Sequence, residues 1–191
     1  MSKVVIQGHA SGTGDFTIAA PNSNTDRTLT LPDEAGTVLT TSGVPSSAMP
    51  AGSVLQVTHN STAVARYQAT VTAFTDTGFS VSITPKFASS KIRIDISATI
   101  YATSHYNYLD IYRDATTSLS GNATSGITDG IAYYTTYWQN ASVFAFDFPN
   151  TTSAVTYNIF SRTASGQVLV GTNTSAAYPN AVYLSATEIA Q

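Results

Sequence analysis

The sequence predicts an all-β protein, an antiparallel jelly-roll-like β-sandwich that follows a segment of short strands. Ser and Thr make up about 28% of the residues, which is far above their average usage. Glu, Lys and Leu, which favour helices, are scarce, whereas Val, Ile, Thr, Tyr and Phe favour strands. Apolar side chains also recur with a period of two along most of the chain, which is typical of half-buried strands.

The first elements are short strands within residues 1–41. Leu29 and Leu31 alternate with threonines, a turn follows at residues 32–36, and the next residues extend again, which predicts a hairpin. A single hairpin is marginally stable in water, and this segment has too few apolar side chains to form a core alone. We therefore expect its apolar side chains to be buried against other copies of the chain. These side chains are Phe16, Ile18, Leu29, Leu31, Val38 and Leu39.

A disordered tail is the alternative for residues 1–41, although the regular alternation and the turn residues disfavour it. Residues 42–52, "SGVPSSAMPAG", are small, uncharged and contain proline, which is typical of a linker.

Residues 53–191 form the predicted sandwich. The segment "KIRIDISATIYA" is the clearest strand, because its isoleucines alternate with polar residues such as Arg93 and Asp95. Turn residues, for example Asp76–Gly78 and Pro149–Asn150, separate the strands. The predicted strands are residues 53–59, 66–74, 78–85, 91–102, 106–114, 130–138, 142–149, 154–162, 166–171 and 181–190.

Charge and composition exclude several classes of function. The net charge is −3, and the eight Lys and Arg residues are scattered, so nucleic-acid binding through phosphate contacts is not expected. The chain has no Cys and therefore no disulfide or thiolate metal site. No apolar run approaches the length of a membrane-spanning helix, so we expect no membrane insertion.

Three blocks of the sequence carry a resemblance to a known family. They are "GTGDFTIAAPNSNTDRTLTLPDEAGTVLTT", "AGSVLQVTH" with the following "FTDTGFSVSITPKFASSKIRIDIS", and the terminal "LSATEIAQ". In this order they resemble tail-fibre proteins of tailed bacteriophages, cyanophages especially. The resemblance covers both ends of the chain well and the region between Tyr101 and Tyr178 poorly.

The resemblance implies a trimeric β-structured virion fibre that attaches to the host cell surface. On this basis we expect residues 1–41 to form an intertwined trimerisation segment of a homotrimer with threefold symmetry, with the six apolar side chains from Phe16 to Leu39 at the trimer interface. The partners expected on this basis are two sister chains, other virion proteins at the N-terminal segment, and a host surface glycan or outer-membrane protein. The location expected is the exterior of the phage tail or capsid. The alternative is a structural virion component, such as a head fibre, a decoration protein, or a collar or baseplate connector, without direct receptor binding.

The poorly matching middle is where we expect receptor binding, because loops and variable surfaces carry recognition on a fixed scaffold. Aromatic rings can stack on sugar rings, and nearby amides and imidazoles can bond hydroxyl groups. The same aromatic residues can instead belong to the core or to a subunit interface, and for Trp138 both readings stay open. The candidate receptor-binding residues are Tyr101, His105, Tyr106, Asn107, Tyr137, Trp138 and Asn140.

Metal, cofactor and catalytic sites are not expected. His9, His59 and His105 are far apart and have no partner at ligand spacing, although a histidine on a threefold axis can gather three imidazoles. Asp110 and Asp114 are about 13 Å apart if they lie along one strand, too far for a carboxylate pair that hydrolyses glycans. No nucleophile motif is present, so we expect a protein that is not an enzyme.

Overall fold

The chain divides into two compact units, Met1–Val38 and Leu39–Gln191. The computed structural model describes residues 10–15, 17, 22–26, 28, 44–62, 66–103, 106–119, 131–134, 138–163, 165–171 and 182–191. All six side chains expected at the trimer interface, from Phe16 to Leu39, lie outside these described residues. The intertwined trimer therefore stays a prediction, and the description below concerns the second unit.

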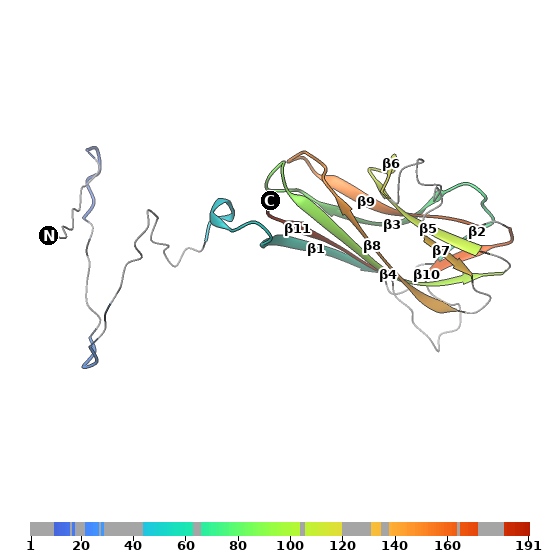
Figure 1. Ribbon diagram of the computed structural model, residues 1–191, viewed down its shortest axis with the longest axis horizontal. Helices are drawn as coiled ribbons and strands as arrows, with labels where there is room; N and C mark the ends of the chain where they lie inside the picture. The colour runs from blue at the N-terminus through green and yellow to red at the C-terminus, as the bar shows by residue number, and fades with distance from the viewer. Residues whose placement is uncertain are drawn as a thin grey trace. The chain divides into compact units, whose positions relative to one another are not determined.

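The second unit is a two-layered β-sandwich (Figure 1), as predicted. Its six-stranded sheet has the order β1-β11-β4-β10-β2, with β8 on the opposite edge of β4, and its five-stranded sheet has the order β3-β9-β5-β6, with β7 also on β5. Every pairing is antiparallel. The strands are β1 (Val54–Thr62), β2 (Arg66–Ala69), β3 (Thr75–Ile83), β4 (Lys91–Ala102), β5 (Tyr106–Arg113), β6 (Thr117–Ser118), β7 (Ile131–Tyr134), β8 (Gln139–Asp147), β9 (Val155–Thr163), β10 (Val168–Gly171) and β11 (Val182–Ile189).

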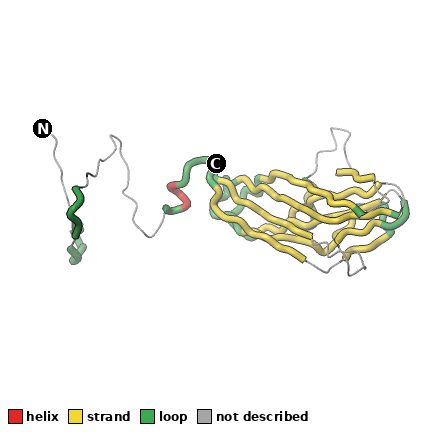
Figure 2. Tube along the Cα trace, turned by 90° about the horizontal axis from the view of Figure 1, so that it is seen from below, coloured by secondary structure: helices red, strands yellow, loops and turns green. Residues whose placement is uncertain are grey.

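The core lies between the two sheets (Figure 2). On β4 the isoleucines predicted to face inward are at most 4% exposed, while Arg93 between them is exposed. Burying one such side chain stabilises the fold by about 1.5–3 kcal/mol. The five-stranded sheet contributes the other wall through Phe79, Val81, Ile83, Leu109, Ile111, Val155, Tyr157 and Ile159.

Two local features differ from the sequence prediction. The predicted turn at Asp76–Gly78 lies inside β3, where the pairing register with β9 shifts between Asp76 and Ser80. Gly78 has a φ of +79°, which suits a β-bulge, and its N–H donates to Asp76 Oδ1 over 2.8 Å. The observed strand β2 is also shorter than the strand predicted for residues 66–74, since it ends at Ala69.

Asp147 links the two sheets. It ends β8 of the six-stranded sheet and is 8% exposed. From the five-stranded sheet, Arg113 Nη1 lies 3.0 Å from both carboxylate oxygens, and the Tyr157 hydroxyl donates to Oδ2 over 2.9 Å. Burial raises the pKa of Tyr157 above its ordinary value, and the nearby Asp147 charge and hydrogen bond raise this pKa further. Tyr157 therefore stays protonated and keeps donating to Asp147.

Glu188 is a fully buried carboxylate at the end of β11. It accepts hydrogen bonds from Gln56 Nε2 over 2.6 Å, from the backbone N–H of Lys86 over 2.7 Å and from Ser90 Oγ over 2.6 Å. Hydrogen bonds to a charged group contribute about 1.5–3 kcal/mol each. Glu188 thus fixes the β3–β4 connection against β1 and β11.

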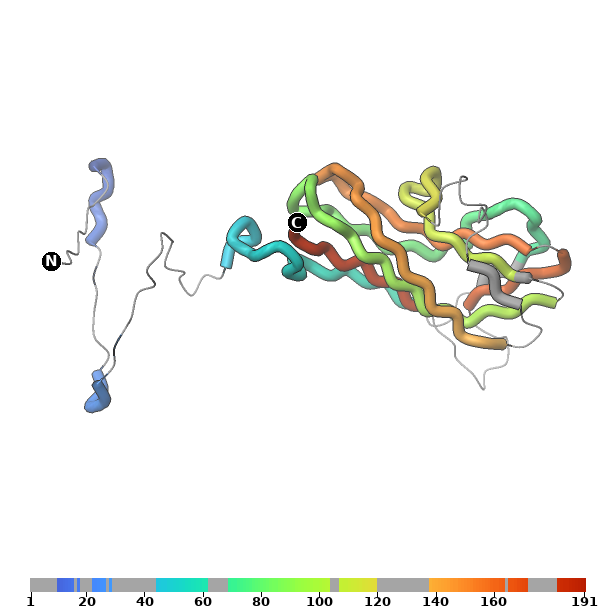
Figure 3. The backbone as a smooth tube through the Cα atoms, in the orientation of Figure 1, coloured from blue at the N-terminus to red at the C-terminus, as the bar shows by residue number. Residues whose placement is uncertain are grey.

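The chain enters the sandwich beside its own C-terminus (Figure 3). The Gly52 N–H donates to the Ala190 carbonyl and the Ala190 N–H donates to the Ser53 carbonyl, both over 2.9 Å. The described part of the predicted linker contains one short 3₁₀ turn, Ser46–Ala48, and Lys86 Nζ donates to Ser46 Oγ over 3.1 Å. The last residues before β1 are therefore tied to the sandwich.

Candidate ligand-binding site

The candidate site lies on the outer face of the six-stranded sheet. The antiparallel register sets side chains of four neighbouring strands in rows across this face, because residues opposite each other on paired strands point the same way. One row runs His59–Ser185–Asp95–Phe144, and the next contains Tyr183–Ser97–Ser142.

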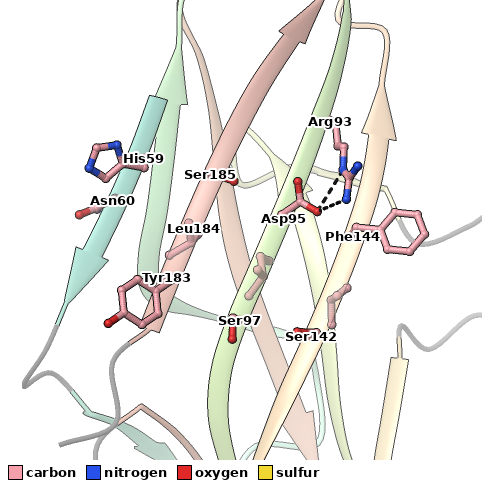
Figure 4. A pocket seen from close by; sticks show the side chains of 12 residues that line it. His59, Asn60, Arg93, Asp95, Ser97, Ser142, Phe144, Tyr183, Leu184 and Ser185 are labelled. Atoms are coloured by element: carbon pink, nitrogen blue, oxygen red, sulfur yellow. Dashed lines mark hydrogen bonds and ion pairs between the residues drawn. The ribbon is translucent and has the colours of Figure 1, made fainter. Parts of the chain in front are cut away.

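These rows form a groove because their side chains differ in length. Ser97, Ser142 and Ser185 and the carboxylate of Asp95 lie between the larger side chains of Tyr183 and His59 on one side and Phe144 on the other (Figure 4). The groove has a volume of about 510 Å³, which is within the size range of small-molecule sites. Its open side faces away from the core, so a ligand reaches it without any rearrangement of the sandwich.

Two aromatic rings flank the groove. Tyr183 on β11 is 58% exposed and Phe144 on β8 is 62% exposed, and they lie on opposite sides of the serines and Asp95 (Figure 4). The Arg93 guanidinium lies 5.8 Å from the centre of the Phe144 ring, within the range of a cation–π contact. Single exposed rings are common on protein surfaces, but two rings on either side of one groove offer a ligand apolar surface on both sides.

One ion pair lies in the groove. Arg93 Nη2 donates to Asp95 Oδ1 over 2.8 Å, and Arg93 Nε donates to the same oxygen over 3.1 Å. Both residues are on β4, two positions apart, and therefore point to the same face. An exposed pair of this kind contributes little to stability, but it places a guanidinium and a carboxylate beside each other as hydrogen-bonding groups.

This combination suits a ligand with both apolar faces and hydroxyl groups. Aromatic rings offer flat apolar surfaces, and Ser97, Ser142 and Asp95 offer hydroxyl and carboxylate oxygens between them. A pyranose sugar has this chemistry, since its ring carries C–H groups on its faces and hydroxyl groups around its edge. Asp95 is the one carboxylate among the described residues that line the groove.

The structure brings three of the sequence-predicted receptor-binding residues together. Tyr101 and Trp138 are half-buried, and their rings stack with centres 5.3 Å apart and planes 27° apart. Asn140 is exposed, and its Oδ1 accepts a hydrogen bond from Thr99 Oγ1 over 2.8 Å. All three belong to the same outer face as the groove.

Among the other predicted receptor-binding residues, Asn107 does not join this group. Asn107 lies on β5 of the five-stranded sheet and is 0% exposed. It accepts a hydrogen bond from Ser161 Oγ over 3.0 Å inside the sandwich. Its prediction as a surface contact is therefore wrong, because its position in the strand points it inward. Tyr106 begins the same strand, and His105 and Tyr137 lie outside the described residues.

Sequence reasoning missed Phe144 and Tyr183. The alternation in "SVFAFDFP" places Val143 and Ala145 on one side and the phenylalanines on the other. Hydrophobicity alone favours the phenylalanine side for the core, whereas in the structure Val143 is buried and Phe144 is exposed. The contribution of Tyr183 needs the pairing of β11 with β4, which the alternation does not specify.

Neither models of known protein families nor curated protein sequences match this chain. Within the parts of the chain that the structure describes, no three His, Cys, Asp or Glu side chains are grouped closely enough to hold a metal ion. The same parts contain no helix that is both long and apolar enough to span a bilayer.

Proposed function

We propose that this protein is an attachment fibre of a bacteriophage whose sandwich binds carbohydrate on the outer face of the six-stranded sheet. The observation that carries the proposal is the groove between Tyr183 and Phe144, with its serines, Arg93 and Asp95. The sequence resemblance to phage tail fibres supports the host surface as the source of the carbohydrate.

The proposal is binding without catalysis. Glycoside hydrolysis ordinarily needs two carboxyl groups on either side of the bond that breaks. Asp95 is paired with Arg93, and none of the other described residues that line the groove is acidic. We therefore assign the groove to recognition.

The proposed assembly is a homotrimer held by residues 1–41. Three equivalent grooves on one fibre strengthen attachment through multivalency even when each groove binds weakly. Light scattering on the purified full-length chain measures the mass in solution, and a monomer at micromolar concentration contradicts the trimer.

A second candidate function is contact with another virion protein. It is favoured by the edge strand β8, which among the described strands pairs only with β4. At its end, Phe146 and Phe148 are 44% and 51% exposed. Lys91 Nζ lies 3.9 Å from the centre of the Phe146 ring and covers part of this surface. Exposed apolar edges of this kind suit protein–protein contacts.

A polysaccharide array distinguishes the two functions. The full-length protein is applied to immobilised neutral and acidic polysaccharide fragments from bacterial surfaces. If the groove binds carbohydrate, Tyr183→Ala and Phe144→Ala each weaken the signal about tenfold, which corresponds to about 1.4 kcal/mol.

The matched control is Phe148→Ala, which removes a ring of similar exposure that follows β8 and lies outside the groove. This variant keeps array binding if the groove is the site. Absence of binding to every fragment contradicts the carbohydrate proposal. Loss of binding to purified phage particles in Phe148→Ala, with no carbohydrate binding by the parent protein, supports the structural alternative.

A further inference from the structure

Beyond the groove, the outward side chains of β4 and β8 continue as a ladder of cross-strand pairs, in which Thr99 is buried and Asn140 is exposed. The register between these strands is regular from Ile92 to Ile100, so alternate pairs share the outer face. The groove end of the ladder is aromatic and charged, and the following two pairs are small and polar. In order these outward pairs are Asp95–Phe144, Ser97–Ser142 and Thr99–Asn140.

The far end of the ladder is aromatic again. Continuing the same register by one outward pair places Tyr101 opposite Trp138, and these two rings are stacked. Leu169 of β10 pairs with Tyr101 on the other side and is buried. Tyr101 and Trp138 are half-buried, so part of the stacked pair faces the solvent and forms an apolar platform.

The two aromatic positions lie farther apart than one sugar ring can reach. Phe144 and Trp138 are six residues apart along the chain, which corresponds to about 20 Å in a strand. Between them the face presents hydroxyl and amide groups from Ser97, Ser142 and Asn140. A ligand that uses both aromatic positions must therefore contain several linked sugars.

The charges on this face favour a neutral ligand. Arg93 and Asp95 form an ion pair with each other, so their charges largely cancel. The other side chains of the ladder between Phe144 and Trp138 are uncharged. The whole chain carries a net charge of −3, which disfavours the approach of an acidic polysaccharide.

We infer that the site takes a neutral oligosaccharide that lies along β4 and β8, from the groove at Phe144 and Tyr183 to the Trp138–Tyr101 platform. This inference rests on the proposed function, because it assumes that the groove binds carbohydrate. It adds that the ligand is an internal stretch of a chain rather than a single terminal sugar, and that it is uncharged.

A length series tests the inference. The probes are neutral and acidic fragments of bacterial surface polysaccharides in graded lengths, and binding of the full-length protein is measured by titration calorimetry. We expect affinity to rise about tenfold from the shortest neutral fragment to those that span both aromatic positions. Trp138→Ala should remove this gain while leaving the affinity for the shortest fragment unchanged.

A second variant provides a test that does not depend on whether Trp138→Ala is folded. Asn140→Tyr places a bulky ring on an exposed position of the ladder, outside the groove and between the groove and the Trp138–Tyr101 platform. It should also prevent the gain with length. The control is Phe148→Ala, which should show the full gain, and the thermal midpoint of each variant reports whether it is folded.

The outcomes separate the inference from the proposed function. Binding that does not depend on length, and that neither variant changes, overturns the inference and leaves carbohydrate binding in the groove intact. Preference for acidic fragments overturns the assignment of a neutral ligand. Absence of binding to any fragment overturns both.

Discussion

The outer faces of the two sheets differ, although both are built from the same alternation of inward and outward residues. On the five-stranded sheet, outward side chains cover one another. Tyr112 stacks on Phe160 with ring centres 4.0 Å apart, and Arg162 lies 4.1 Å from the centre of the Tyr108 ring. Asp110 is 2% exposed and accepts a hydrogen bond from Ser118 Oγ over 2.7 Å.

On the six-stranded sheet, Phe144 and Tyr183 remain open to solvent, and each is more than half exposed. Phe144 and Phe160 both have an aspartate directly opposite, Asp95 and Asp110, so the size of that neighbour does not explain the difference. Phe160 lies on β9 between β3 and β5 and stacks on Tyr112, whereas Phe144 lies on β8, which among the described strands pairs only with β4. The comparison teaches that a ring between two strands with another ring to stack on becomes part of the packing, whereas a ring on an edge strand becomes the wall of a groove.

The largest expected effect is a difference in stability between two matched variants, one on each face. Phe160→Ala removes a ring that is 9% exposed and should lower the free energy of unfolding by about 3 kcal/mol. Phe144→Ala removes an equivalent ring that is 62% exposed and should change this free energy by less than about 0.5 kcal/mol. Urea denaturation of both variants measures the difference, and equal losses contradict the contrast between the faces.

A smaller effect on stability is expected from Tyr157, which lies in the core between the two sheets. Tyr157→Phe removes the hydrogen bond to Asp147 and should cost about 1 kcal/mol at neutral pH. The pKa of Tyr157 is raised in the folded state, so its contribution is fully present below the unfolded pKa of about 10 and is lost as pH rises above it. There the unfolded chain releases the proton first, which costs the folded state up to about 1.4 kcal/mol per pH unit.

Urea denaturation across alkaline pH measures this loss. The phenylalanine variant lacks the titrating hydroxyl, so the stability difference between it and the parent protein should shrink as pH rises above 10. Curves that stay parallel across this range contradict the assignment of a raised pKa to Tyr157.

Much of the fold was predictable because the strands are half-buried. Alternation such as that of Ile92 and Ile94 with Arg93 specifies both the strand and its inner face. Turns were also predictable from their residue types. Asn150 and Gly166, in the turn sequences Pro149–Asn150 and Ser165–Gly166, adopt positive φ values of 53° and 75°. The Asp76–Gly78 signal was misread because a β-bulge uses the same residues as a turn.

The groove was not predictable because it depends on which strands are neighbours. Tyr183 and Ser97 are 86 positions apart in the sequence and pair only through β11 and β4. The alternation of apolar and polar residues indicates which side chains share a face of the sheet, but it contains no information about strand order. Aromatic density in the middle of the chain did indicate Tyr101 and Trp138, which stack, yet it also indicated Asn107, whose strand turns it toward the core.

The entry of the chain beside its own C-terminus has a mechanical consequence. Residues 52 and 53 bond Ala190 and lead directly into β1, which then pairs with β11 from Val54 to Thr62. A pull on the N-terminal side of β1 acts along the axis of that strand, so the hydrogen bonds between β1 and β11 share the force as a shear load. They therefore do not break one at a time from one end, and the connection between the sandwich and the residues that precede it is suited to bear tension.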